Sequence, residues 1–416
     1  MASPEFRRLS ADEHGAFQRV VDYAFSAEDG PPSSDEPAPA DDDSAATDDQ
    51  STAAEDDLGR RFGVVAEDTV RSVCTHHDFT VSLRDEWVPL AGLATLATLP
   101  EYRRQGDGRR LVEGSLDEWR GDYPLAALWP FDYGYYEQFG WAMATKLATY
   151  TCPPAALGFG RDAPGTLRRI GPDDWAQLQA VDEAYASDRD LVVRRDEQWW
   201  RQRIFQTIGG KDRYVYALDR DGDVHGYITY TVESDGETRR LVSYYSGFTD
   251  YDAYRGLLGH LSNHDSQVDE VRLYRTADSS LLDAVPDPGA VECEIHSGAM
   301  VRVVDVVDAL EAISYPEDCT ETVTLAVSDD TAEWNDGQFE LSVSDGRGSC
   351  SRLSESDARS DPDAILDVGT LTQILVGFNA VDEARTFGDL RVASEDVARR
   401  LSTLFPPRTV CPLDNF

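Results

Sequence analysis

The sequence predicts a mixed α/β (α+β) protein that is divided into three domains. Its 416 residues exceed what a single hydrophobic core of ordinary size uses. The order of apolar strand patterns and amphipathic helix patterns in residues 1–155 recurs in residues 165–298. Residues 299–416 carry a third, separate set of strands and helices. We therefore expect domain boundaries between 155 and 165 and at 298–299.

The charge of the chain is strongly acidic. The formal net charge is -40, and Lys146 and Lys211 are the only lysines, so that Arg supplies nearly all the positive charge. Such a surface stays hydrated where salt screens charge within about 3 Å at 1 M. We therefore predict a halophilic protein from the salt-rich cytoplasm of a haloarchaeal cell. The same charge disfavours nucleic acid and anionic membranes as partners.

Sequence features typical of membrane-spanning segments or of metal sites are weak throughout the chain. The N-terminus has no apolar core of signal-peptide length, and no run of about 18 apolar residues occurs. The six cysteines form no C-x-x-C pair, which predicts buried thiols instead of a zinc site or a disulfide framework. His76 and His77 are adjacent in a strand pattern and point to opposite faces. We expect a soluble protein without a metal.

The first domain opens with a strand and a helix in residues 6–25. Residues 28–57 then carry Asp, Glu, Ser, Ala and Pro without Lys or Arg, a composition that predicts a disordered acidic insertion. The insertion is either solvated and without a role of its own, or it draws cations toward a nearby cleft. Further strands are expected over 61–67, 70–78 and 87–98, with a last strand over 146–150.

The stretch GLATLATLPEYRRQGDG, residues 92–108, predicts a strand that leads through a loop into a helix. Apolar residues before Pro100 can extend, and proline cannot continue a strand ladder. A helix over 109–119 and a strand over 125–129 follow. The loop therefore lies at the strand-to-helix corner of a βαβ unit.

This loop has the composition of a phosphate site. Gly106 and Gly108 let main-chain N–H groups converge on an anion. Arg103, Arg104 and Arg109 add positive charge where the helix begins. The spacing Arg103-x-x-Gly106-x-Gly108 resembles the loop with which GNAT acyltransferases hold the pyrophosphate of coenzyme A. The alternative is an ordinary Arg-rich turn that caps a surface helix.

The second domain repeats this order without the loop. Its helices are expected over 175–185 and 197–205, and its later elements are a hairpin over 213–232, a strand over 241–248, a helix over 251–261 and a strand over 268–274. The matching corner reads GFTDYDAYRGLLGHL, which lacks the basic residues and paired glycines. We therefore predict a second GNAT-like domain that has no coenzyme A site.

The third domain is expected to be an α+β unit. It opens with a strand over 300–304 and a helix over 308–313. Its further strands and helices are predicted over 323–327, 338–344, 368–376 and 395–401.

Several motifs in the same order resemble the Eis (enhanced intracellular survival) acetyltransferases, which have two GNAT domains and a sterol-carrier-like (SCP2-like) domain. The motifs are LATLATLPEYRRQG, LWPFDYGYYEQFGW, MVRVVDVVDAL, WNDGQFELSVSDG and the terminal PLDNF. The acidic insertion and the large residues Phe131 and Tyr133 depart from the family pattern. The resemblance implies acetyl-CoA-dependent acetyl transfer directly to a primary amine of an aminoglycoside, a polyamine or a lysine side chain. It also implies a homo-oligomer, a hexamer in relatives.

The resemblance further implies the site residues. The family builds its acetyl-CoA pocket from the strand before the loop, from the loop and from the end of the next strand, which here are Leu96, Ala97, Thr98, Arg104, Gln105, Gly106, Asp107, Gly108, Arg109, Phe131 and Asp132. The general acid of the family corresponds to Tyr136, and its general base is the C-terminal carboxylate, which here belongs to Phe416. Amine attack on a thioester needs one proton acceptor and one proton donor.

On the residues alone, other interpretations stay open. Tyr136 lies among other aromatic residues, which favours a packing role, and a chain terminus is usually frayed. Two further function classes remain: an acyl-CoA or apolar-ligand binding or sensor protein without turnover, and an assembly scaffold. Acetyl transfer to a panel of amines would separate these classes.

Overall fold

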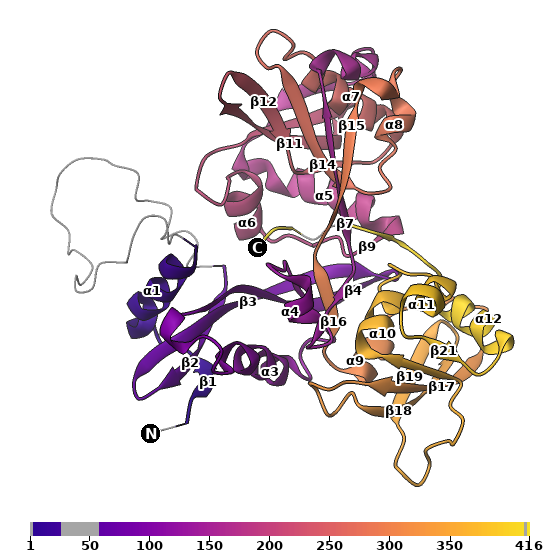
Figure 1. Cartoon of the computed structure of the whole chain (residues 1–416). Helices are drawn as coiled ribbons and strands as arrows, with labels where there is room; N and C mark the ends of the chain where they lie inside the picture. The colour runs from indigo at the N-terminus through magenta and orange to yellow at the C-terminus, as the bar shows by residue number, and fades with distance from the viewer. Residues whose placement is uncertain (1–2, 26–57, 412–413) are drawn as a thin grey trace.

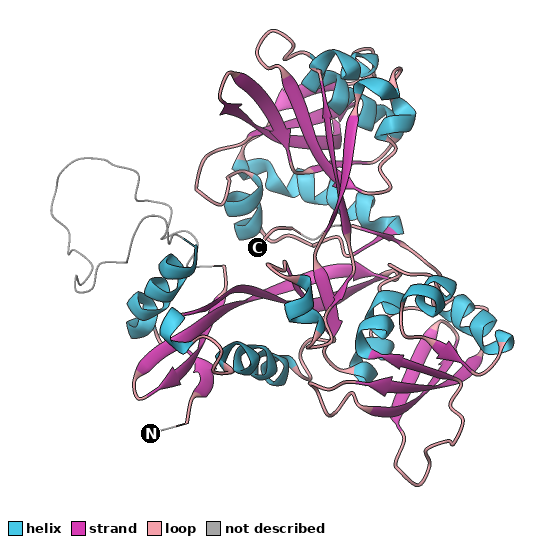
Figure 2. Cartoon of the chain, in the orientation of Figure 1, coloured by secondary structure: helices cyan, strands magenta, loops and turns pink. Residues whose placement is uncertain are grey.

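The computed structural model describes residues 3–25, 58–411 and 414–416 of the chain. The predicted acidic insertion at 28–57 lies outside the described residues, as does Leu413 in the tail. Figure 1 shows three lobes in chain order, with the C-terminus between the first and second lobes. Figure 2 shows that the longer strands are gathered in three separate sheets with helices against them. A two-stranded ladder, β9 (Arg189–Asp190) with β22 (Thr409–Val410), ties the end of the chain to the second lobe.

The first sheet has seven strands in the order β1-β2-β3-β4-β5-β16-β6. Their bounds are Glu5–Arg8, Arg60–Ala66, Thr69–Leu83, Glu86–Thr98, Leu125–Leu128, Met300–Val303 and Ala142–Met143. Helix α1 is His14–Phe25, α3 is Asp107–Trp119 and α4 is Tyr133–Glu137. The apolar face of α3, which includes Leu111, Leu116 and Trp119, is buried and covers one face of this sheet.

The second sheet has eight strands, with the order β15-β7-β14-β12-β11-β10-β8 and with β13 paired to β11. Their bounds are Glu292–Ser297, Lys146–Cys152, Glu270–Thr276, Thr238–Ser243, Asp223–Asp235, Tyr214–Arg220, Thr166–Arg169 and, for β13, Ser246–Phe248. Helices α5 (Trp175–Tyr185), α6 (Glu197–Trp199), α7 (Tyr251–Ser262) and α8 (Leu281–Ala284) belong to the same lobe.

Two strands lie in a different sheet from the one that chain order predicts. The strand predicted over 146–150 to complete the first domain is β7, which pairs with β14 and β15 of the second sheet. The strand predicted to open the third domain is β16, which pairs with β5 and β6 of the first sheet. The first two lobes thus exchange equivalent strands. Sequence cannot reveal this exchange, because an apolar strand pattern does not name its partner.

The third sheet has five strands in the order β19-β18-β17-β20-β21. Their bounds are Arg347–Arg352, Gly337–Ser344, Glu321–Ser328, Ala364–Asp367 and Arg391–Val392. Helices α9 (Val306–Glu311), α10 (Val368–Leu375), α11 (Val381–Phe387) and α12 (Glu395–Leu404) pack with it. One buried apolar cluster includes Leu90, Val215 and Leu325, one from each lobe, so that the three lobes share a core.

Smaller differences from the predictions concern single elements. The helix predicted over 197–205 is the short α6 followed by a π-helical turn, Trp200–Ile204. The strand predicted over 241–248 is divided into β12 and β13 at Tyr244 and Tyr245. Five cysteines are buried as predicted, whereas Cys293 on the edge strand β15 is exposed. No helix of the described residues is long and apolar enough to cross a membrane.

Candidate active site

A gap opens in the first sheet where β4 and β5 stop pairing. Their parallel ladder joins Leu90–Leu93 to Leu125–Leu128, and β4 then continues to Thr98. Among the described residues, Leu96, Ala97 and Thr98 have no partner in β5. An unpaired strand edge of this kind can take an extended ligand as an added strand.

A β-bulge in β4 accompanies this gap. Thr75 pairs with Ala94 and Val73 pairs with Ala97, so that Thr95 and Leu96 face one residue of β3. Thr95 has a φ of 54°, which is uncommon for a β-branched residue. The sequence analysis missed the bulge because nothing in the residue types marks it. The bulge changes the direction of the strand immediately before the predicted ligand-binding residues.

The loop between β4 and α3 offers free main-chain donors. Gly106 has a φ of 87° and is the N-cap of α3, and Arg104 has a φ of 59°. Within the described chain, the amides of Arg104, Gln105 and Gly106 donate no hydrogen bond. Unpaired amides beside a helix N-terminus are the donors that a phosphate group needs.

The side chains of the loop divide between solvent and interior. Arg104 and Arg109 are exposed, and the guanidinium of Arg109 lies 3.1 Å from Glu113 and 4.8 Å from the centre of the Phe139 ring. Gln105 Nε2 donates to the Glu101 carbonyl at 2.7 Å. The carboxylate of Asp107 is buried, which leaves its main-chain amide as the group for the predicted contact with the coenzyme. The carboxylate accepts from Arg110 at 2.8 Å and is thereby kept away from a bound anion.

Gly108 is required by a close contact. A Cβ at this position would lie 2.3 Å from the hydroxyl oxygen of Tyr135, so that a larger residue would require the Tyr135 side chain to move. Tyr135 belongs to the short helix α4, whose N-cap Asp132 accepts from the Tyr135 amide at 2.8 Å. Phe131 is exposed, and its ring centre lies 5.3 Å from those of both Tyr135 and Tyr136. The structure therefore brings Phe131 and Asp132 to the helix that carries Tyr136.

Tyr136 is 3 % exposed and lies in the apolar cluster that contains Ala91, Leu93 and Leu128. No hydrogen bond joins its hydroxyl to another described residue. Burial raises the pKa of Tyr136 above its ordinary value, with smaller contributions from Tyr135 and Cys74. The phenol consequently keeps its proton at neutral pH.

The C-terminal tail is fixed by Asp414, a residue that the sequence analysis did not select. Arg195 donates to both carboxylate oxygens of Asp414 at 2.7 Å, and Trp199 Nε1 donates to Oδ2 at the same distance. Trp129 Nε1, at the end of β5, donates to the Asp414 carbonyl at 2.9 Å. These bonds join the tail to the first and second lobes. They connect residues that are far apart in the sequence and that only folding brings together.

Arg195 also holds a second carboxylate. Its guanidinium pairs with Asp182 of α5, and the Tyr227 hydroxyl donates to Asp182 Oδ1 at 2.7 Å. Burial raises the pKa of the Asp182 carboxyl to about 6. Arg195 is therefore the shared partner of two buried carboxylates, Asp182 and Asp414.

Phe416 and Tyr136 lie on opposite faces of the first sheet. The Phe416 ring packs on His77 and Phe79, and it lies 2.9 Å from where a Cβ of Gly92 would be. Gly92 and Leu93 are consecutive in β4 and point to opposite faces. Because Tyr136 is in the cluster of Leu93, the two predicted catalytic residues approach the start of the gap from its two sides.

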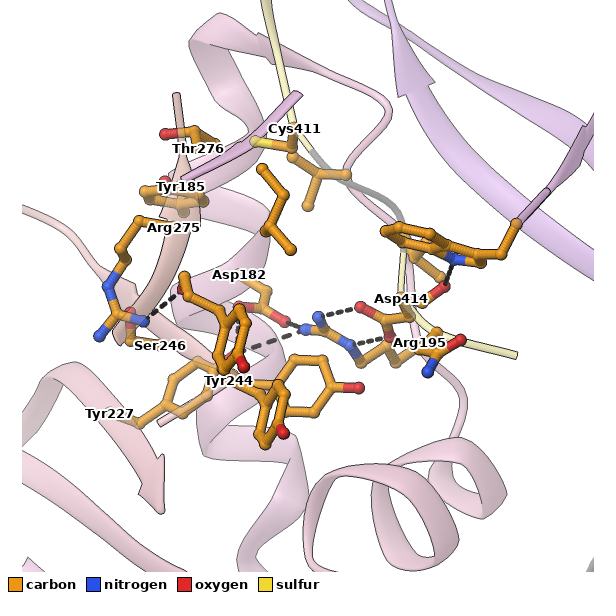
Figure 3. Close-up of a pocket in the computed structure, with 17 residues that line it drawn as sticks. Asp182, Tyr185, Arg195, Tyr227, Tyr244, Ser246, Arg275, Thr276, Cys411 and Asp414 are labelled. Atoms are coloured by element: carbon orange, nitrogen blue, oxygen red, sulfur yellow. Dashed lines mark hydrogen bonds and ion pairs between the residues drawn. The ribbon is translucent and has the colours of Figure 1, made fainter. Parts of the chain in front are cut away.

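A cavity of about 270 Å³ lies beside the tail. Figure 3 shows residues from the second lobe around it, with Asp414 and Cys411 of the tail on one side. Asn415, which precedes the terminal residue, also lines it. The cavity therefore lies within one residue of the terminal carboxylate.

The corresponding corner of the second lobe has a different structure. Helix α7 begins after Asp250, whose carboxylate accepts from the Ala253 amide at 2.9 Å and pairs with Arg220. The last pair of β12 and β14 is Ser243 with Leu273. Beyond it, the rings of Tyr244 and Tyr274 stack at 4.5 Å across the space between the strands. A carboxylate and an aromatic pair occupy the positions that are open in the first lobe.

Comparison with known domain families agrees with these two related lobes and the third. Two acetyltransferase (GNAT) domain families match residues 5–144 and 191–303, and the sterol carrier protein domain family matches residues 306–411. The protein is an enzyme of the acyltransferase class, with two GNAT domains and a C-terminal sterol carrier protein domain. Enzymes with GNAT acetyltransferase domains use acetyl-CoA as a substrate.

Its homologues are Eis-like and other GNAT N-acetyltransferases. An uncharacterized N-acetyltransferase of Streptomyces griseus is 28% identical over 378 residues, which cover 83% of this chain and 86% of the relative. The N-acetyltransferase Eis of Mycobacterium tuberculosis is 26% identical over 359 residues, which cover 83% of this chain and 85% of the relative. A GCN5-related N-acetyltransferase of Anabaena variabilis has the same fold, with a TM-score of 0.83 at 19% identity over the whole of both chains.

Proposed function

We propose that this chain transfers an acetyl group from acetyl-CoA directly to a primary amine, with the reaction in the gap of the first GNAT domain. The free amides of Arg104, Gln105 and Gly106 beside the unpaired edge of β4 carry this proposal. In the proposed complex they bind the diphosphate, and exposed Arg104 and Arg109 add charge to the same site. The main chain of Leu96–Thr98 binds the pantetheine arm.

The bound substrate supplies an acetyl thioester, and the chain supplies the two proton-transfer groups. In the proposed mechanism the terminal carboxylate of Phe416 accepts the proton of the attacking amine. Tyr136 donates its hydroxyl proton to the departing thiolate on the other face of the sheet. An α-carboxyl ordinarily has a pKa of about 3.5, so a water or a charged neighbour is needed to assist it.

Three finer features belong to the same proposal. The acceptor is an aminoglycoside, a polyamine or a lysine-type amine, as the Eis resemblance implies. The acidic composition, with a net charge of -40, supports a role in the cytoplasm of a salt-rich, haloarchaeal cell. The assembly is a homo-oligomer, a hexamer by the same resemblance.

The test is acetyl transfer by the full chain in molar KCl, with acetyl-CoA binding measured separately. We expect Tyr136→Phe to lower turnover about 10²-fold while the acetyl-CoA affinity stays nearly unchanged. The matched control is Tyr123→Phe, which removes a hydroxyl bonded to Asp78 in the same lobe. Unchanged turnover in Tyr136→Phe would remove that residue from the mechanism.

The same measurements separate the other function classes. Binding of acetyl-CoA without transfer to any amine would favour an acyl-CoA sensor or carrier. Absence of acetyl-CoA binding by a folded chain would favour a scaffold and would contradict the proposal.

A further inference from the structure

The lining of the cavity beside the tail balances two arginines, Arg195 and Arg275, against two aspartates, whereas the chain as a whole has a net charge of -40. Its carboxylates, Asp182 and Asp414, are both paired with Arg195. Hydrogen bonds from Tyr227 and Trp199 further satisfy these two groups. A cationic ligand that enters the cavity finds no uncompensated carboxylate on these residues.

The tyrosine rings of the cavity are also poorly placed to bind a cation. The guanidinium of Arg189 lies 4.0 Å from the ring centre of Tyr185. Arg195 and Arg213 lie 5.5 and 5.2 Å from that of Tyr245. Because these arginines already contact the rings of Tyr185 and Tyr245, these two rings are less favourable for an ammonium group.

Arg275 is the positive group that remains. It lines the cavity from β14, and no carboxylate of the described residues lies within 4.0 Å of its guanidinium. NH1 donates to the Tyr274 carbonyl at 2.7 Å and to the Ser243 carbonyl at 3.5 Å, and NH2 donates to Ser243 Oγ at 3.4 Å. The buried Nε has no acceptor among the described residues. Burial lowers the pKa of the guanidinium, the direction expected for a cation that lacks a compensating partner.

The two ends of the cavity therefore differ. Figure 3 shows Arg275 on one side and Asp414 on the other, with Tyr244 between them. The Asp414 side includes Asn415, the residue before the one that bears the terminal carboxylate. A ligand that spans the cavity would meet, at one end, a guanidinium that no described carboxylate neutralises, and the proposed general base beyond the other end.

We infer that the acceptor is a small amine that also bears a carboxylate, which Arg275 binds while the amine points to the C-terminus. This inference rests on the proposed transfer of acetyl to a primary amine and restricts the acceptor to amines that bear a carboxylate, which excludes polyamines and aminoglycosides. Arg binds a carboxylate with charge-assisted hydrogen bonds, and the buried position strengthens them. At about 270 Å³ the cavity is below the roughly 300–1,000 Å³ of sites for drug-sized ligands, which suits a molecule of amino-acid size.

The experiment compares ω-amino acids, from β-alanine to 6-aminohexanoate, with their amides and with diamines of equal length. Acetyl transfer is followed in molar KCl with the full chain. We expect kcat/KM for the best ω-amino acid to exceed that for its amide about tenfold or more, because the neutral amide makes weaker hydrogen bonds to a guanidinium than a carboxylate does. Diamines should have a lower kcat/KM than either the ω-amino acids or their amides.

Arg275→Gln should remove the preference for the carboxylate, and Arg275→Lys should retain part of it. The matched control is Arg272→Gln, on the same strand but outside the cavity lining. An unchanged ratio in folded Arg275→Gln would overturn the inference, as would diamines that are better acceptors than ω-amino acids.

A binding measurement separates this inference from the proposed function. Hexanoate, which has no amine, should bind the wild-type chain more tightly than hexanamide in calorimetry. If acetyl transfer fails with every amine but this difference is present, only the proposed reaction is contradicted. If transfer proceeds and hexanoate shows no advantage, the assignment of Arg275 is contradicted.

Discussion

The two GNAT domains repeat one topology around two different gaps. In the first, β4 and β5 separate beside a loop whose N-cap is Gly106, with a φ of 87° and free amides. In the second, the helix begins at Asp250, which is bonded to Ala253 and Arg220, and the Tyr244–Tyr274 stack bridges the strands. The two domains therefore share the backbone arrangement of the strand-to-helix corner, and a few residues at this corner decide whether it can bind an anion.

The two domains are nevertheless interdependent. Each sheet contains a strand from the other half of the chain, β16 in the first and β7 in the second. The second domain also supplies Arg195 and Trp199, which fix Asp414 near the gap of the first. A domain without a predicted coenzyme site therefore positions a predicted catalytic group of its neighbour.

The largest expected effect is at Arg195. Arg195→Ala leaves Asp182 and Asp414 buried without their cation, which should lower the free energy of unfolding by about 3–5 kcal/mol. Denaturant titration in molar KCl measures this change. The neighbouring control is Arg194→Ala, whose half-exposed pair with Glu183 at 2.9 Å should cost at most about 1 kcal/mol. Equal effects of the two substitutions would contradict a special role of Arg195 in joining the domains.

The next effect concerns the tail. Removal of Asn415 and Phe416 should lower turnover about 10²-fold or more, since the proposed proton acceptor is lost. Steady-state kinetics with a good amine acceptor measures the loss, and acetyl-CoA affinity should stay unchanged. Phe416→Leu keeps the carboxylate and an apolar side chain and should retain most activity. Full turnover in a folded truncation would exclude the terminal carboxylate as the base.

The third effect tests the first loop directly. Gly106→Val places a β-branched residue at a φ of 87°. The strain, about 1–2 kcal/mol, should move the loop and weaken acetyl-CoA binding about tenfold. Gly121→Val is the control, because Gly121 has a φ of 85° and open space around it, but lies beyond the far end of α3. If both variants bind acetyl-CoA equally well, the loop is not the diphosphate site.

The smallest effect concerns the second corner. Asp250→Ala removes the cap of α7 and its pair with Arg220, which should cost about 1 kcal/mol of stability. Acetyl-CoA affinity and stoichiometry, measured by calorimetry, should not change. A weaker affinity or a lost second binding event would show that the second domain also binds the coenzyme, and the contrast between the domains would no longer hold.

Much of the first site could be predicted from local sequence. The Pro100 stop, the glycines and the arginines are consecutive residues whose backbone preferences act locally, and the structure places them between β4 and α3 as expected. The inward direction of the Asp107 carboxylate, which accepts from Arg110, was not predicted. Backbone preference alone could not decide on which side of the helix that side chain would pack.

Sequence by itself determined the three-part organisation, the repeated strand and helix order and the basic loop, because these depend on short-range periodicity and on the conformational freedom of glycine. Only the tertiary structure decided the strand exchange, the Thr95 bulge, the Asp182–Arg195–Asp414 bridge and the cavity with Arg275. Each of these four features either joins residues that are far apart in the chain or depends on the packing between such residues. Their energies arise from burial and pairing, which no local pattern records.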